Sequence, residues 1–195
     1  MKPKKENIIT ILMICLILKM RKLKNSELNR KTVSEFKLSK KNPVIIILDN
    51  VRSMNNVGSI FRTADAFLIE KIYLCGITAI PPHKDIQKTA LGSTDSVKWE
   101  YCESTTKIVN ELKKNEIEII AIEQTDESKI LNDFKPIANK SYGFIFGNEV
   151  KGISQDVLDI VDNSIEIPQL GTKHSLNISV SVGIILWDFY SDIKI

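Results

Sequence analysis

The chain has 195 residues, 43% of them hydrophobic, which is enough to bury one sizeable core and fits one main domain with an appendage. Residues 1–41 hold 12 lysines and arginines against 3 acidic residues, whereas the remainder holds 15 against 21. A basic arm on a mildly acidic body suggests an anionic partner, nucleic acid above all, although a solvated tail has the same composition. Three cysteines without a CxxC pair and two histidines exclude a disulfide framework and a zinc site, and they fit a reducing cytoplasm.

In residues 1–19, three lysines precede an apolar run from Ile8 to Leu18. The run is short for a bilayer span, and no small-residue cleavage site follows it. We therefore expect residues 1–19 to be an extension outside the functional protein, with Met20 as its start and no stable membrane association. A weak membrane anchor is the alternative. Residues 20–42 form the basic arm, in which 26–38 have helical character, and residues 43–195 form the main domain.

Apolar strands alternate with helical segments along the main domain. Val44–Leu48 is a run of β-branched residues and leucine, typical of a strand buried on both faces of a parallel sheet. Further strands are expected at 71–75, 97–101, 117–122, 142–146 and 164–167. Helices are expected at 59–68, 84–91 and 104–115, after 154, and from 175 to about 190. This order predicts an α/β fold with a mostly parallel sheet flanked by helices.

Three polar loops follow predicted strands, at the sheet edge where open α/β folds hold ligands. Their chemistry-bearing residues are Asn56, Gly58 and Arg62 in the first, Gly147, Asn148, Glu149 and Gly152 in the second, and Gly171, Ser175 and Asn177 in the third. Each loop alone has a structural explanation: Arg62 can pair with Asp65 on a helix surface, and Ser175 or Asn177 can cap the last helix. Together at one edge they favour a binding site.

Two common phosphate-binding motifs are absent from these loops. The first strand is followed by one glycine rather than by G-x-G-x-x-G, and Gly152 is followed by Ile153 and Ser154 rather than by Lys-Ser/Thr. A nucleoside-type ligand would therefore be held differently, largely by backbone groups.

Three ordered segments resemble the signatures of the SpoU (TrmH-like) RNA ribose 2′-O-methyltransferases. They are NNVGSIFRTADAF at 55–67, FIFGNEVKGI at 144–153 and IPQLGTKHSLNISV at 167–180. The resemblance covers about residues 43–190, and three segments with correct spacing are more specific than any one alone.

The resemblance implies a C-terminal deep trefoil knot, S-adenosylmethionine (AdoMet) as methyl donor, no metal, and a cytoplasmic homodimer that binds tRNA or rRNA. It places the cofactor near Ile122, Gly147, Ile167 and Leu176. It makes Arg62 the catalytic arginine, close to the dimer seam, and gives Asn56, Glu149, Ser175 and Asn177 positioning roles at the catalytic centre.

The reaction implied is attack of a ribose 2′-hydroxyl on a sulfonium methyl group. Because arginine rarely loses its proton, we interpret Arg62 as the cation that stabilises the developing alkoxide rather than as the base. A base-modifying knotted methyltransferase and a catalytically inactive RNA-binding relative are the alternatives. Independently of the resemblance, Leu176–Tyr190 is apolar over so much of its circumference that a second protomer is expected against it.

Overall fold

A computed structural model of the chain describes residues 20–193, so the predictions for 1–19 lie outside the described residues. The chain divides into two compact units at Thr32/Val33. Within the described range, no helix has both the length and the apolar character that a membrane crossing requires. The arm boundary predicted at residue 42 stays a prediction.

Residues 20–32 contain one short 3-10 turn, η1 (Asn25–Glu27), followed by left-handed backbone at Asn29 with φ +48°. Arg21 forms a two-pronged ion pair with Glu27, with N···O distances of 2.7 and 3.0 Å. The continuous helix predicted over 26–38 is therefore wrong in its first half, because the left-handed residue interrupts it. Only α2 (Val33–Leu38) is helical, and its Phe36 is buried in the core of the second unit.

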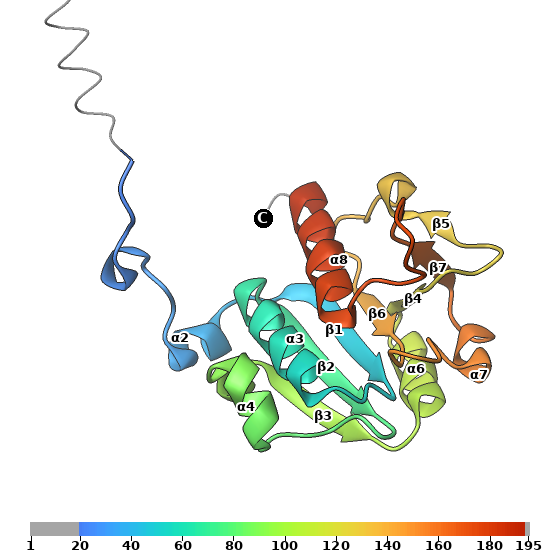
Figure 1. The fold of residues 1–195 in the computed structure, drawn as a ribbon, viewed down its shortest axis with the longest axis horizontal. Helices are drawn as coiled ribbons and strands as arrows, with labels where there is room; N and C mark the ends of the chain where they lie inside the picture. Colours follow the sequence, from blue (N-terminus) through green and yellow to red (C-terminus); the bar gives the residue numbers. More distant parts are fainter. Residues whose placement is uncertain (1–19, 194–195) are drawn as a thin grey trace, which may run out of the picture. The chain divides into compact units, whose positions relative to one another are not determined.

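The second unit is built on a seven-stranded sheet in which each neighbouring pair is parallel (Figure 1). Its strands are β1 (Asn42–Asp49), β2 (Ile69–Cys75), β3 (Lys98–Cys102), β4 (Glu118–Ile122), β5 (Lys129–Ile130), β6 (Tyr142–Phe146) and β7 (Asn163–Glu166). Their order across the sheet is β3-β2-β1-β6-β4-β7-β5. The predicted α/β fold is confirmed.

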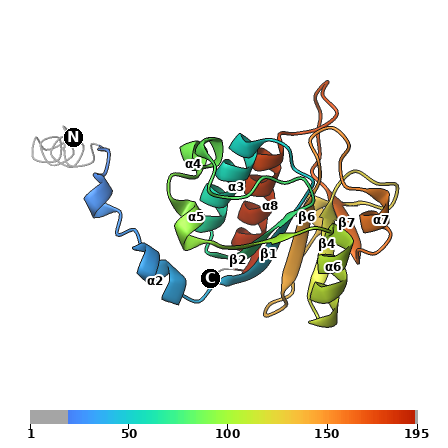
Figure 2. The ribbon, with the colours of Figure 1, turned by 90° about the horizontal axis from the view of Figure 1, so that it is seen from below.

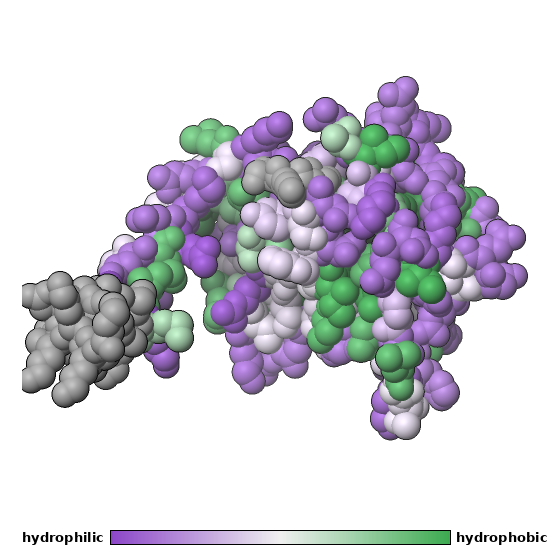
Figure 3. Space-filling view, turned by 90° about the horizontal axis from the view of Figure 1, so that it is seen from above, coloured by the Kyte–Doolittle hydropathy of each residue, from purple (hydrophilic) through white to green (hydrophobic). Residues whose placement is uncertain are grey.

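Helices cover both faces of this sheet (Figure 2). One face carries α3 (Met54–Ala66), α4 (Lys84–Ala90), α5 (Ser93–Ser96) and α8 (Ile178–Ile193), and the other carries α6 (Thr105–Lys114) and α7 (Gln155–Leu158). The buried side chains form two hydrophobic cores, and β1 contributes to both. Val44, Ile46 and Leu48 belong to one core, and Ile45 and Ile47 belong to the other. This alternation explains why β1 reads as continuously apolar. Figure 3 shows, for the face seen from above, that apolar side chains also reach the surface among hydrophilic ones.

Two helix starts differ from the prediction, and both differences bear on the polar loops. Helix α3 begins at Met54, five residues earlier than expected, because the Ser53 hydroxyl accepts a hydrogen bond from the Asn56 N–H at 3.3 Å and caps the helix. Asn56 therefore lies on the first turn of a helix rather than in a loop. Helix α8 begins at Ile178 rather than at Ser175, so Ser175 and Leu176 remain in the preceding loop.

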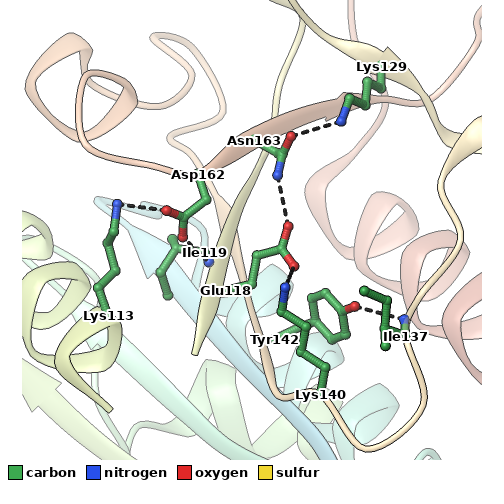
Figure 4. Close-up of polar contacts among 9 residues, drawn as sticks. All are labelled: Lys113, Glu118, Ile119, Lys129, Ile137, Lys140, Tyr142, Asp162 and Asn163. Carbon is green, nitrogen blue, oxygen red and sulfur yellow. Dashed lines mark hydrogen bonds and ion pairs between the residues drawn. The ribbon is translucent and has the colours of Figure 1, made fainter. Parts of the chain in front are cut away.

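A network of charged and amide side chains ties together the amino ends of β4, β6 and β7 (Figure 4). We call it the amino-end network; it consists of Lys113, Glu118, Lys129, Lys140, Asp162 and Asn163. Glu118 contacts Lys140 at 2.6 Å and accepts a hydrogen bond from Asn163 at 2.8 Å, while Asp162 contacts Lys113 at 2.8 Å. Asp162 also accepts a bond from the backbone N–H of Ile119 at 2.9 Å. The network fixes the short strand β7 beside β4.

Candidate functional site

The three loops meet at the carboxyl edge of the sheet, as the sequence predicts, because β1, β6, β4 and β7 are consecutive in the strand order. A cavity of about 680 Å³ opens there between the ends of β4, β6 and β7 and the segment that leads into α8. All four residues predicted to contact the cofactor line this cavity: Ile122, Gly147, Ile167 and Leu176. Glu149, Ser175 and Asn177 line it as well.

The loop after β6 is a tight turn that depends on two glycines. A Cβ on Gly147 would lie 2.2 Å from the carbonyl carbon of Gly152, and Gly152 has φ +68°. Asn148 closes the turn, since its side-chain oxygen accepts from the N–H groups of Val150 and Lys151 at 3.0 and 3.1 Å. Its amide donates to the carbonyl of Asn50 at 2.7 Å and so ties this loop to the loop after β1.

A chain of hydrogen bonds connects all three loops; we call Asn56, Glu149 and Asn177 the loop junction. Glu149 accepts from the backbone N–H groups of Arg52 and Ser53 at 3.0 and 2.9 Å, and from the Asn56 amide at 3.1 Å. The Asn56 side-chain oxygen accepts from the Asn177 amide at 3.2 Å. Three segments that are far apart in the sequence thus share one chain of polar contacts, of which Glu149 and Asn177 line the cavity and Asn56 does not.

Glu149 is held in its ionised form. Partial burial acts to raise its pKa, but the hydrogen bonds from the backbone N–H groups of Arg52, Glu149 and Ser53 and from the Asn56 side chain outweigh burial, so its pKa is lowered. A carboxylate fixed in this way organises its neighbours and is not a proton donor near neutral pH.

Asn177 caps the last helix, as its alternative structural explanation proposes. Its side-chain oxygen accepts from the backbone N–H of Ser179 at 2.9 Å and from the Ser179 hydroxyl at 2.7 Å. The amide of Asn177 also donates to Asn56, so the same side chain both caps α8 and connects the loops of the site. The structural and the functional explanation of Asn177 therefore do not compete. Ser175 is exposed and makes no hydrogen bond within residues 20–193.

Arg62 lies outside the cavity lining and is exposed on α3. The predicted surface pair with Asp65 is not formed, since the Asp65 carboxylate accepts a hydrogen bond from Ser96 instead. Within the described range, Arg62 makes neither a hydrogen bond nor an ion pair. It lies six positions along the helix from Asn56, which corresponds to a rise of about 9 Å and a rotation to another side of the helix. The structure therefore brings together four of the five predicted catalytic residues and leaves Arg62 apart.

Two cavity residues, Glu123 and Gln124, were not predicted from the sequence. Glu123 accepts hydrogen bonds from the N–H groups of Ile153 at 3.1 Å and Gln124 at 3.0 Å, and the Gln124 amide donates to the carbonyl of His174 at 3.2 Å. The pair therefore connects β4 to the second and third loops. The available signal was a polar dipeptide directly after an apolar strand, the same pattern that identified the other loops.

A buried carboxylate beneath the loops was also missed. Asp49, 1% exposed at the end of β1, accepts from the Thr105 hydroxyl at 2.5 Å and the Asn50 amide at 2.9 Å. It also accepts from the backbone N–H of Ser154 at 3.2 Å and from its hydroxyl at 3.3 Å. Asp49 thus joins the start of α6 to the exits of two loops.

Near this edge of the sheet we find neither a reactive thiol at Cys75 nor, among the described residues, a cluster of metal-binding side chains. Burial raises the pKa of the Cys75 thiol to about 12, so it stays protonated. Among residues 20–193, no three His, Cys, Asp or Glu side chains are grouped so that they could hold a metal ion.

Comparison with known proteins identifies a family for this arrangement. The model of the SpoU rRNA methylase family matches residues 43–187. A 23S rRNA (guanosine-2′-O-)-methyltransferase RlmB of Neisseria meningitidis serogroup B is 28% identical over 144 residues, which are 74% of this chain and 56% of that protein. A tRNA (guanosine(18)-2′-O)-methyltransferase of Aquifex aeolicus is 29% identical over 164 residues, 81% of this chain and 74% of that one.

A solved structure shares the fold. The AdoMet-bound rRNA methyltransferase of Sinorhizobium meliloti superposes with a TM-score of 0.72 at 24% identity, covering 78% of this chain and 57% of that one. This chain spans about half the length of several curated relatives.

Proposed function

Because this chain belongs to the SpoU rRNA methylase family, we propose that it is an AdoMet-dependent methyltransferase acting on a ribose 2′-hydroxyl of tRNA or rRNA. The observation that carries the proposal is the loop junction, which connects the three signature segments beside one cavity that Glu149 and Asn177 line. The names of the Neisseria and Aquifex relatives support both the 2′-hydroxyl and the two RNA classes.

The cavity suits AdoMet in size and lining. Its volume of about 680 Å³ lies within the usual range for small-molecule sites. Ile122, Ile167 and Leu176 offer apolar surface for an adenine ring, and Glu123 offers acceptors for polar donors. When bound, AdoMet supplies an electrophilic methyl group on a sulfonium. The Sinorhizobium protein, which has the same fold, binds AdoMet.

This chain's own residues orient the RNA ribose and stabilise charge. Asn56 and Asn177 offer amide groups to sugar hydroxyls, held in position by Glu149 and by the cap of α8. Arg62, whose guanidinium makes no hydrogen bond or ion pair within the described residues, is available for the alkoxide that develops as the 2′-hydroxyl loses its proton. Because Glu149 is ionised and accepts three hydrogen bonds from the protein, we assign it to positioning.

Two alternatives remain open to experiment. A base-modifying enzyme would leave methyl groups on nucleobases, and an inactive relative would bind RNA without transferring a methyl group. The intact loop junction favours an active ribose methyltransferase over both.

The deciding experiment maps 2′-O-methyl sites in total RNA with and without this gene, and repeats the transfer in vitro with purified protein and labelled AdoMet. We expect one or a few 2′-O-methyl sites to disappear with the gene and to be restored by the protein. Methyl groups found only on bases would support the first alternative. RNA binding without transfer at any site would support the second.

We propose that the protein works as a homodimer through α8. Val180, Trp187 and Tyr190 are 50%, 62% and 39% exposed on this helix, which is more apolar surface than a solvated helix needs. Nothing lies within 4 Å of a Cβ placed on Gly183, which leaves room for another backbone. A seam here would also bring a second protomer near α3, the helix that carries Arg62 and packs against α8. Analytical ultracentrifugation at micromolar concentration tests this: Trp187→Glu should yield monomers, and an active wild-type monomer would contradict the proposal.

We also propose that the C-terminal segment forms a trefoil knot, that the protein is located in the cytoplasm, and that the basic arm binds RNA. The loop leading into α8 and the loop after β6 line one cavity, which is compatible with the C-terminal segment threading as a knot. A crystal structure whose backbone path is not knotted would contradict the knot.

Cell fractionation tests the cytoplasmic location. For the arm, replacing Lys22, Lys24 and Lys31 by serine should flatten the salt dependence of RNA binding, whereas an unchanged slope would remove the arm from the interface.

A further inference from the structure

The carboxylate of Glu123 is fixed in place at the wall of the cavity. Its two oxygens accept from the N–H groups of Gln124 and Ile153. Gly152 packs so closely that a Cβ there would lie 2.3 Å from Glu123 Oε2. At its base, the Glu123 backbone N–H donates to Ile165 at 3.1 Å and its carbonyl accepts from Ser164. The carboxylate is therefore preorganised by groups on three separate segments.

This carboxylate keeps acceptor capacity for a ligand. An ionised carboxylate has about four acceptor positions, and backbone N–H groups occupy two of them, one on each oxygen. One position on each oxygen remains for two donors that lie side by side. A vicinal diol presents two hydroxyl donors at such a spacing, and a carboxylate that binds a ribose hydroxyl is a recurring solution in nucleotide sites.

The strand order separates Glu123 from the reacting end of the cavity. The loop junction lies over the ends of β1 and β6, whereas Glu123 directly follows β4, which is one strand from β6 and two from β1. At about 4.8 Å per strand, the lateral separation is about 5 Å from the β6 side of the junction and about 10 Å from its β1 side. Glu123 therefore faces the part of a bound cofactor that lies away from the methyl group to be transferred.

We propose that Glu123 is the residue that recognises the ribose diol of the cofactor's adenosine, so that it selects ribonucleoside cofactors. This rests on the proposed use of AdoMet. Gln124 supports it by donating to the carbonyl of His174, which holds the third loop at the cavity.

The test measures binding, not turnover. Isothermal titration calorimetry with S-adenosylhomocysteine and with its 2′-deoxy and 3′-deoxy analogues is carried out on the full chain and on Glu123→Gln. In the wild type, loss of a hydroxyl should weaken binding about 10-fold or more, the size expected for a hydrogen bond to a charged group. In Glu123→Gln the parent ligand should weaken similarly, whereas the deoxy analogues should be nearly unaffected. Because the ratio of affinities is measured within one protein, partial unfolding of the variant does not change it.

Glu166→Gln is the matched control. Glu166 also lines the cavity, but its carboxylate accepts no hydrogen bond within residues 20–193, so removal of the same charge should leave the preference for the diol intact. Equal weakening of all three ligands by Glu123→Gln would overturn the proposal and reduce Glu123 to a support of the loop after β6. Failure of the wild type to bind S-adenosylhomocysteine at all would instead contradict the proposed function itself.

Discussion

The two edges of the sheet use the same strands and the same kinds of side chain, yet they differ in what their polar groups contact. At the amino ends of β4, β6 and β7, the carboxylates of Glu118 and Asp162 each meet a lysine and a further donor within the protein. At the carboxyl ends, Glu123 and Glu149 are held mainly by backbone N–H groups and line a cavity. Arg62, further along α3, makes no hydrogen bond or ion pair within the described residues. Carboxylates paired with lysines stabilise the fold, whereas the carboxylate of Glu123, which backbone N–H groups hold beside a cavity, keeps acceptor positions for a ligand.

The largest effect should follow from Arg62→Ala. We expect turnover to fall about 100-fold or more, as it does when an oxyanion donor is removed, with affinity for S-adenosylhomocysteine almost unchanged because Arg62 is outside the cavity. Single-turnover methylation measures the first quantity and calorimetry the second. Lys88→Ala, an exposed cation on the neighbouring helix α4, is the control. If Arg62→Ala methylates at the wild-type rate, Arg62 is not the cation that stabilises the alkoxide.

A smaller loss of activity should follow from Glu149→Gln. The neutral amide can accept from Arg52, Ser53 or Asn56 less strongly than the carboxylate, so we expect a fall of about 10-fold in kcat/KM. The matched control is Glu118→Gln, the same change at the other edge of the sheet, which should leave activity unaltered. If the two substitutions lower activity equally, the carboxyl edge is no more important for activity than the amino edge.

Glu149 also gives the carboxyl edge a pH dependence of known sign. Its pKa is lowered in the folded protein from the ordinary 4.5, so its contribution to stability is present above pH 4.5. That contribution declines as the pH falls below 4.5 and is lost once the pH drops through the lowered pKa. Thermal melts across this range should therefore fall less steeply for Glu149→Gln than for the wild type. Parallel curves would show that the carboxylate contributes no such linkage.

At the amino edge, Asp162→Ala should affect stability rather than activity. The substitution leaves the backbone N–H of the buried Ile119 without an acceptor and Lys113 without its carboxylate, a loss of about 1–3 kcal/mol in the free energy of unfolding. Urea denaturation measures this loss, with the exposed Asp126→Ala as control. Folded Asp162→Ala should retain the wild-type kcat; a lowered kcat at full occupancy would extend the functional region to the amino edge.

The smallest effect should come from Lys140→Met. The Glu118 hydrogen bond raises the pKa of Lys140, but the ammonium group is solvated, and ion pairs of this kind contribute little. The melting temperature should be the same as that of the wild type at high salt. A clear drop under those conditions would indicate that the amino-end network acts as a cooperative unit.

The sequence predicted the strands well because apolar β-branched runs such as Val44–Leu48 read the same in any parallel sheet. It misjudged the start of α3 because a single hydroxyl, that of Ser53, decided where the helix began. It missed the two-residue strand β5, which exists only by pairing with β7. Short elements that depend on a distant partner leave little local pattern.

The same reason limits prediction of the site. Residue types and spacing, with the family resemblance, predicted Asn56, Glu149 and Asn177, but not that they hydrogen-bond to one another across the three loops. Glu123 and Asp49 were missed because their roles depend on hydrogen bonds from the backbone N–H groups of Ile153 and Ser154. These groups approach the two carboxylates only in the folded chain.

The bond between Asn56 and Asn177 joins residues 121 positions apart, which has a consequence for a chain still being made. At about 5–20 residues per second, translation leaves Asn56 without Asn177 for roughly 6–24 s. During that time α3 can fold and present Arg62, but the loop after β7 does not yet exist to complete the cavity. A nascent chain is therefore unable to modify RNA on the ribosome that is synthesising it, and any product that stops before α8 has no complete site.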